Sequence, residues 1–172
     1  MKKLRYIVAM SLDGYIAGPK GEYDWITPDP DVDFAALWAQ FDTAIMGRRT
    51  YEVAKSRLGD KAFESVKAVV VSRTMKPPDD TRVTLISELT KDRMQGLRKC
   101  AAKDIWLFGG GDLFRTLLEM GEVDTVEVSI IPVLLGGGVK LLPGAAERAE
   151  LKLIDQKTYA SGRVSLVYEV AK

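Results

Sequence analysis

The sequence contains no histidine and only one cysteine, Cys100, in 172 residues. The missing histidine excludes the Ser-His and Cys-His nucleophile systems and removes a common zinc ligand, so we expect no metal site. A single cysteine forms no intramolecular disulfide, which favours the reducing cytoplasm. Any proton transfer must use Asp, Glu, Lys, Tyr or water.

The chain also has no excess of either charge and no apolar run of membrane-spanning length. Its 25 basic and 24 acidic residues give a formal net charge of +1, which provides no broad surface for nucleic acid or an anionic membrane. The apolar run after the basic residues 1–6 is short, which favours a strand over a signal peptide. We therefore expect neither nucleic acid nor a membrane as a partner.

Composition and pattern predict one folded domain over residues 1–172. Hydrophobic residues make up 47% and charged residues 28%, as in a globular protein. Strands are predicted at 4–10, 43–46, 67–74, 82–86, 105–108, 123–131, 151–159 and 164–170, and helices at 31–41, 47–58, 90–103 and 112–120. This alternation predicts an α/β fold, a single three-layer domain with a mostly parallel mixed sheet, helices on both faces and C-terminal antiparallel strands.

The predicted helices carry apolar residues that we expect to face the core. These are Phe34, Leu37, Trp38 and Phe41 in the first helix, and Leu97, Cys100 and Ala101 in the third. Gly59 is placed to cap the second helix. Residues 11–21 contain three glycines and a proline and predict a long loop at a strand end, where ligand-binding loops tend to lie.

The stretch Ile105–Leu118 combines a buried strand, three glycines and the start of an amphipathic helix. Glycines allow close approach of a ligand to the backbone, and a helix start favours an anion, so this turn predicts a site for a phosphate-bearing cofactor. The alternative is a plain strand-to-helix connection. The usual dinucleotide fingerprint is not met, because Phe114 stands where its third glycine is required, and no P-loop lysine follows.

Three strand ends carry turns of a related kind. They are Gly47-Arg48-Arg49-Thr50, Ser72-Arg73-Thr74 and Gly109-Gly110-Gly111-Asp112. Ligands of parallel sheets bind outside the carboxyl ends of the strands. Helix starts suit a pyrophosphate and arginines suit a 2′-phosphate, so the set predicts NADPH rather than NADH. Taken singly, each arginine is more often a solvated surface charge, and the prediction rests on the three turns together.

The loop from Ser11 to Trp25 is a candidate lid over this site. Trp25 either packs on substrate or nicotinamide or is a buried core indole. Asp13 either orients the substrate or anchors the turn. Tyr51 faces either the ligand or the core. We take Asp13, Trp25 and Tyr51 as candidate substrate-binding residues.

Several motifs together resemble the dihydrofolate-reductase-like superfamily, and within it the stand-alone branch similar to the reductase domain of riboflavin biosynthesis. The motifs are residues 11–17 with Trp25-Ile26-Thr27, residues 46–52, residues 108–111, and Val123-Asp124 with residues 131–136. The resemblance extends from Leu4 to Val170. It implies a mixed sheet of about eight strands, an NADPH site, and hydride transfer to a C=N or C=O bond.

The resemblance also implies residue roles. Its cofactor-binding positions are Ala9, Ile16, Ala17, Gly47, Arg48, Arg49, Thr50, Ser72, Arg73, Phe108, Gly109, Gly110, Gly111, Asp112 and Leu113. A cis peptide is implied between Gly109 and Gly110. A catalytic carboxylate is implied at the start of the first helix, where Asp31 and Asp33 both compete; the alternative for either is a helix cap or an exposed first-turn acid. Phe108 departs from the riboflavin-type pattern, which has glutamate there.

The main hypothesis is an NADPH-dependent reductase of a small heterocyclic substrate, similar to a pteridine or a ribosylaminopyrimidine. The alternative is an NADP(H)-binding protein without turnover that has a regulatory or interaction role. The apolar segment 126–135 and the loop at 136–139 predict a homodimer, as the riboflavin-type resemblance also implies. Alternatively, residues 126–131 form a central strand that is covered within one chain.

Overall fold

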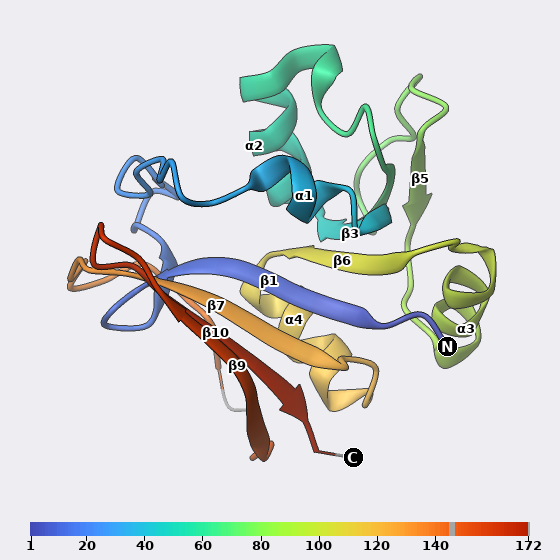
Figure 1. The fold of residues 1–172 in the computed structure, drawn as a ribbon. Helices are drawn as coiled ribbons and strands as arrows, with labels where there is room; N and C mark the ends of the chain where they lie inside the picture. The colour runs from blue at the N-terminus through green and yellow to red at the C-terminus, as the bar shows by residue number, and fades with distance from the viewer. Residues whose placement is uncertain (145–146, 172) are drawn as a thin grey trace.

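The structure is a computed structural model that describes residues 1–144 and 147–171. Its main sheet has eight strands in the order β5-β4-β3-β6-β1-β7-β10-β9 (Figure 1). They are β1 (Leu4–Ser11), β3 (Phe41–Gly47), β4 (Lys67–Val71), β5 (Val83–Ile86), β6 (Asp104–Gly109), β7 (Thr125–Ile131), β9 (Leu151–Thr158) and β10 (Val164–Val170). The pairs are parallel except those of β10, which is antiparallel to β7 and β9. The predicted mostly parallel α/β fold is confirmed.

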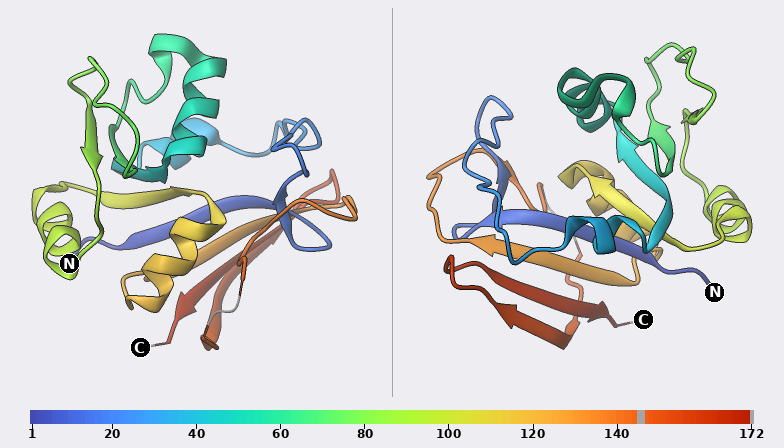
Figure 2. Two further views of the ribbon diagram at one scale, coloured as in Figure 1. Left: turned by 180° about the vertical axis from the view of Figure 1, so that it is seen from behind. Right: turned by 45° about the horizontal axis from the view of Figure 1, so that its top comes forward.

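Helices cover both faces of this sheet (Figures 1 and 2). On one face lie α1 (Phe34–Trp38), α2 (Arg48–Leu58) and the short 3-10 helix η1 (Gly59–Lys61), and on the other lie α3 (Lys91–Cys100) and α4 (Gly111–Glu119). Gly59 caps α2 with a φ of 55°, as predicted. Among the described helices, none is long and apolar enough to cross a membrane.

Alternation along β1 divides the core into two layers. Tyr6 is fully buried and packs with the α3 and α4 side, whereas Ile7 packs with the α1 and α2 side. This follows from strand geometry, in which successive side chains point to opposite faces. The first layer is closed by Phe114 of α4, whose ring stacks on Tyr6 with centroids 4.0 Å apart.

An aromatic cluster fixes α1 against the end of β6. The ring centroids of Trp38 and Trp106 are 4.5 Å apart, and those of Trp106 and Phe108 are 5.0 Å apart. The Trp106 Nε1–H donates to the carbonyl oxygen of Ile7 at 3.2 Å, so the buried indole is satisfied. Phe63 completes the cluster with its ring centroid 5.8 Å from that of Phe108. Phe108 is therefore held within this aromatic cluster just before the glycine turn.

The first predicted helix is wrong in length and in one of its four core residues, since Leu37 and Trp38 pack on the core and Phe41 is buried, as expected. It ends at Trp38, and Phe41 instead begins β3, where it is paired with Asp104 of β6. Phe34 does not face the core, because 47% of it is exposed. Pairing with β6 sets this boundary, because the backbone groups that would form hydrogen bonds within a longer helix instead form them with the neighbouring strand.

Two further expectations need correction. The predicted loop at 11–21 contains β2 (Tyr15–Ala17), which forms a small antiparallel sheet with β8 (Val139–Lys140). The helix predicted at 90–103 ends at Cys100, which is exposed, while Ala101 is buried. Ala101 has extended backbone angles, so its side chain leaves the helical pattern that we used to place both residues inward.

Candidate functional site

The three turns identified from the sequence come together at the carboxyl ends of β3, β4 and β6. These strands are consecutive in the sheet, in the order β4-β3-β6. The Thr50 hydroxyl oxygen lies 3.7 Å from the points that a Cβ on Gly109 or on Gly110 would occupy. The Arg48 Nη1 donates to the Thr74 hydroxyl at 3.2 Å. The turns thus form one continuous surface.

Both helices at this surface begin after a glycine. Gly47 precedes α2 and Gly110 precedes α4, and neither residue caps its helix with a side-chain hydrogen bond. The first N–H groups of each helix therefore receive no side-chain cap from that residue, and such helix starts favour an anionic ligand. The peptide between Gly109 and Gly110 is cis, as the resemblance implied. Asp112, in the first turn of α4, is exposed.

Three exposed arginines lie on these turns, two at the start of α2 and one after β4. Arg48 is 46% exposed in its side chain and also pairs with Glu52 at 2.6 Å, and both Arg49 and Arg73 are exposed. The Ser72 hydroxyl accepts from the backbone N–H groups of residues 74 and 75 at 3.3 and 3.1 Å. Ser72 thereby shapes the turn that carries Arg73. Exposed guanidinium groups beside open helix starts favour a ligand with several phosphates.

Asp13 holds the loop that follows β1. Its carboxylate accepts from the buried Ser11 hydroxyl at 2.6 Å and from the backbone N–H groups of Leu135 and Gly136, the latter at 2.7 Å. The Ser11 oxygen in turn accepts from the Tyr15 N–H at 3.0 Å. These donors, the Ser11 hydroxyl first, lower the pKa of Asp13. The position favours an anchor, and substrate binding by Asp13 stays a prediction.

The candidate acids lie on the segment between β2 and α1. Asp33 is the N-cap of α1 and accepts from the Ala36 N–H at 2.8 Å. Asp31 is exposed, and its backbone N–H donates to Asp29 Oδ1 at 3.0 Å. The structure thus distinguishes two acids that the sequence left equivalent: one carboxylate is engaged in capping, whereas the other faces solvent.

The other candidate residues take different positions. Trp25 is half-buried, with its Nε1 donating to the Glu22 carbonyl at 3.2 Å. Tyr51 is only 5% exposed and stacks on Phe63, so its position favours the core alternative. Ala9 of β1 and the β2 residues Ile16 and Ala17 are half-buried near the loop end of the sheet.

Three residues missed by the sequence reasoning brace the segment that carries Asp31. The Ser161 hydroxyl donates to the carboxylate of Asp29, and the buried Arg163 donates to the carbonyl of Thr27 at 3.0 Å. The Ser161 hydroxyl is the main cause of the lowered pKa of Asp29. These contacts tie the segment to the turn between β9 and β10. They join residues more than 130 positions apart, and we find no local signal in the sequence that announces them.

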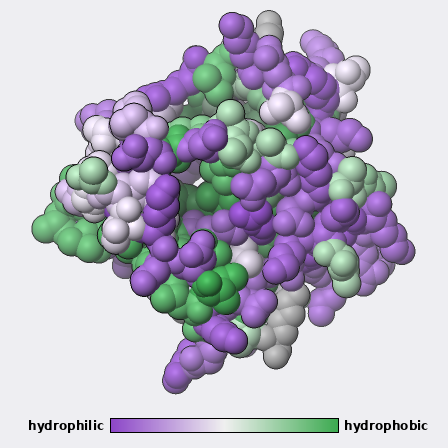
Figure 3. All heavy atoms as spheres, viewed as in Figure 1, coloured by the Kyte–Doolittle hydropathy of each residue, from purple (hydrophilic) through white to green (hydrophobic). Residues whose placement is uncertain are grey.

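A hollow opens on the α1 side of the sheet. Figure 3 shows it with apolar residues in its floor, between the 18–33 segment and β1 as Figure 1 places them. Ala9 is in register with Ser129 of β7, which is in register with Ser165 of β10. Residues in register share a face, and this face is that of Ile7, which packs toward α1 and α2. The two serine hydroxyls are 3.2 Å apart.

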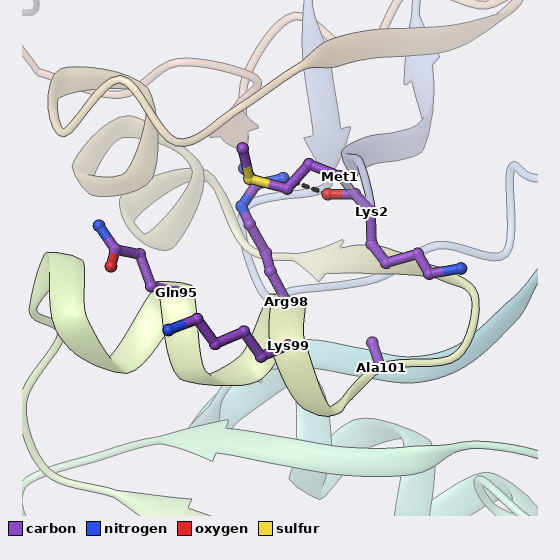
Figure 4. A pocket seen from close by; sticks show the side chains of 6 residues that line it. All are labelled: Met1, Lys2, Gln95, Arg98, Lys99 and Ala101. Carbon is purple, nitrogen blue, oxygen red and sulfur yellow. Dashed lines mark hydrogen bonds between the residues drawn. The ribbon is translucent and has the colours of Figure 1, made fainter.

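A separate cavity lies beside the N-terminus, just before β1, and α3 (Figure 4). Arg98, in its wall, donates to the Lys2 carbonyl and to Asp124 Oδ2, the latter at 2.7 Å. Asp124 also accepts from the Leu4 N–H at 2.7 Å. These bonds fix the start of β1. We therefore regard the residues around this cavity as structural and do not include them in the candidate site.

The fold and the glycine turn place the chain among dihydrofolate-reductase-like α/β domains of the riboflavin-reductase type. More specifically, the chain belongs to the RibD C-terminal domain family, whose model matches residues 2–167. A curated relative, the uncharacterized protein YyaP of Bacillus subtilis (strain 168), is 35% identical over 181 residues, which cover 98% of this chain and 96% of YyaP.

Solved structures extend this comparison. A Shewanella sp. PV-4 protein, provisionally assigned to riboflavin biosynthesis, is 26% identical with a TM-score of 0.86 over 99% of both chains. The Thermotoga maritima diaminohydroxyphosphoribosylaminopyrimidine deaminase/5-amino-6-(5-phosphoribosylamino)uracil reductase is 14% identical, with a TM-score of 0.74 over 99% of this chain and 57% of the other. At 14% identity, the similarity to the Thermotoga maritima protein shows a shared fold and nothing more.

Proposed function

We propose that this protein is an NADPH-dependent reductase that transfers a hydride to a C=N or C=O bond of a small heterocyclic acceptor. The observation that carries the proposal is the meeting of two uncapped helix starts with three arginines at the ends of β3, β4 and β6. Membership of a family related to a reductase supports the same conclusion. The acceptor would resemble a pteridine or a ribosylaminopyrimidine.

The site residues fit the cofactor chemically. The open N–H groups after Gly47 and Gly110 suit a pyrophosphate. Arg49 and Arg73, both exposed, suit a 2′-phosphate, because guanidinium keeps its charge and offers several donors. Bound NADPH would supply the hydride. The protein would position the nicotinamide beside Ala9 and exclude water with the loop that Asp13 anchors.

Asp31 is our proposed group for moving the proton to the reduced atom. Its carboxylate is exposed on a segment held in place by Asp29 and Arg163. Asp33 would act through its cap on α1, which fixes where that segment ends. Trp25, half-buried on the same segment, would pack on the acceptor.

We also propose a homodimer and a cytoplasmic location. The predicted segment 126–131 proves to be the strand β7, covered on both sides by β1 and β10, so it no longer supports a dimer. Exposed apolar residues on β9 now support it instead. The single cysteine supports a reducing compartment.

Titration with NADPH and NADH, followed by quenching of the three tryptophans, tests the cofactor assignment. We expect NADPH to bind about tenfold more tightly than NADH, since one charged contact is worth roughly 1–2 kcal/mol. Arg73→Gln should remove most of that preference and leave NADH binding unchanged. Lys152→Gln, which removes an exposed charge on β9, is the matched control. No saturable NADPH binding up to millimolar concentration would contradict the proposal.

Turnover is tested separately from binding. NADPH oxidation is followed with pteridine, pyrimidine and quinonoid acceptors, and Asp31→Asn should lower kcat with little change in cofactor affinity. Saturable NADPH binding without oxidation in any of these mixtures would favour the alternative of a nucleotide-binding protein without turnover.

A further inference from the structure

The acceptor side and the cofactor side of the site differ sharply in charge. Residues 12–40, which include the 18–33 segment beside the hollow and carry Asp31, contain six acids and one lysine, a formal charge of −5. The acids are Asp13, Glu22, Asp24, Asp29, Asp31 and Asp33. The turns at 47–50 and 72–74 contain three arginines and no acid. A phosphate is thus attracted to one side of the site and repelled from the other.

The cations that border the hollow are already engaged. Arg5 binds both carboxylate oxygens of Glu127, at 2.6 and 2.8 Å. Arg163 is buried and donates to the Thr27 carbonyl. Lys157, in register with Ser165, places its Nζ over the Tyr159 ring, 4.5 Å from the centroid. Reorienting any of these groups toward a phosphate would break a contact of the fold.

The remaining nearby cations lie on or against the 18–23 turn. Lys20 is exposed there, and its backbone N–H donates to the Glu22 carboxylate at 2.5 Å. Arg57 of α2 stacks over the Tyr23 ring, 3.7 Å from its centroid. Within residues 1–144 and 147–171, we find no arginine pair at the acceptor hollow like the one at the cofactor turns.

We propose that the acceptor is an uncharged or cationic heterocycle that carries no phosphate. This inference rests on the proposed function and narrows its substrate class. The floor that would receive the ring is neutral: Ala9 is small, and the Ser129 and Ser165 hydroxyls each donate and accept a hydrogen bond. Polar ring atoms match such a floor, whereas a phosphate dianion would face the acids of the 12–40 segment with only the exposed Lys20 to offset them.

Equilibrium binding to protein loaded with NADP⁺ tests the proposal. NADP⁺ binding is measured first, and its absence would mean that the proposed function has failed. A ribosylaminopyrimidine and its 5′-phosphate, identical otherwise, are then titrated by calorimetry. We expect the unphosphorylated compound to bind about tenfold more tightly, from like-charge repulsion of roughly one unit pair. Equal or tighter binding of the phosphate ester, or binding of neither compound, overturns the proposal.

Charge variants connect the preference to the acceptor side. Asp31→Lys should raise the affinity for the phosphate ester several-fold and leave NADP⁺ binding unchanged. Asp92→Lys makes the same charge change on exposed α3, on the opposite face of the sheet, and should alter neither affinity. An Asp31→Lys variant that binds the two compounds in the wild-type ratio would show that the acids do not set the preference. Far-ultraviolet circular dichroism checks that both variants are folded.

Discussion

The Tyr6 hydroxyl is a buried polar group that the fold leaves unsatisfied. Within the described residues it has no hydrogen-bond partner, and the side chain is fully buried against Phe114. A buried hydroxyl without a partner costs free energy that its removal recovers. Tyr6→Phe should therefore raise the free energy of unfolding by about 1 kcal/mol in urea titrations at neutral pH. Tyr168→Phe, at a half-buried position, is the control and should not stabilise the protein.

The same side chain should make the free energy of unfolding decrease at alkaline pH. Burial raises the pKa of Tyr6 above its ordinary value of about 10, because the ionised form is desolvated. Because the pKa is higher in the folded protein, Tyr6 ionises in the unfolded chain first as the pH rises. The free energy of unfolding is therefore unaffected by this group below the pKa of the unfolded chain and falls as the pH rises above it. Urea titrations above pH 10 should show a shallower loss for Tyr6→Phe than for the wild type. Parallel losses in the two proteins would contradict this.

Asp13 should control the order of the loops that it joins. Its pKa is lowered, so the anchor is present above the ordinary aspartate pKa and is lost as pH falls through the lowered value. Asp13→Asn should weaken the hydrogen bonds that the backbone N–H groups of Leu135 and Gly136 donate to this side chain. Those two amides should then exchange hydrogen faster. Asp155→Asn is the control, since its carboxylate accepts only from the adjacent Gln156 N–H among the bonds seen here. Unchanged exchange in Asp13→Asn would refute the anchor.

At the level of elements, strands and turns with a strong local signal were predictable. The alternation in Val164–Val170 and the glycine turn after Phe108 appear as predicted, and the β-branched run predicted as a strand at 67–74 forms one that ends earlier, at Val71. Each depends on neighbouring residues, so periodicity and turn chemistry suffice. The convergence of the three turns followed from one further rule, that parallel strands end at a common edge of the sheet.

Elements that depend on distant partners were not predictable. The three residues of β2 become a strand only because Val139–Lys140 pairs with them. Phe41 is in a strand and not in the predicted helix because its backbone pairs with Asp104 of β6. The brace by Ser161 and Arg163 likewise joins the two ends of the chain. In each case tertiary contacts decide between local conformations of similar energy.

The start of α4 packs so closely on the end of β8 and the segment that follows it that only glycine fits there. A Cβ on Gly111 would lie 2.7 Å from the Lys140 carbonyl oxygen and 2.7 Å from Pro143 Cδ. Gly111→Ala should therefore displace this segment and lower the free energy of unfolding by about 1–3 kcal/mol in urea titrations. Gly137→Ala, in the neighbouring loop, meets nothing within 4 Å and should be close to neutral. Equal stability of the two variants would contradict the packing argument.

For the whole molecule, the sheet extends beyond the helices that cover it (Figure 2). A row of apolar residues in register passes from Tyr6 in the core through Val126 and Tyr168 to Leu153 on the edge strand β9. Leu153 is 45% exposed, and Leu151 and Ile154 on the same strand are similarly exposed. An exposed apolar edge strand is a liability in a monomer unless another chain covers it.

We therefore expect a dimer that buries the outer face of β9 and β10. Light scattering during gel filtration at micromolar concentration should give twice the chain mass of 19.0 kDa. Leu153→Lys should shift the protein to the monomer with unchanged circular dichroism, because a desolvated ammonium opposes burial of that face. Asp155→Lys places the same side chain on the opposite face of β9, next to Val167, and should leave the dimer intact. A wild-type monomer, or dissociation by both variants alike, would show that this apolar row is not the interface.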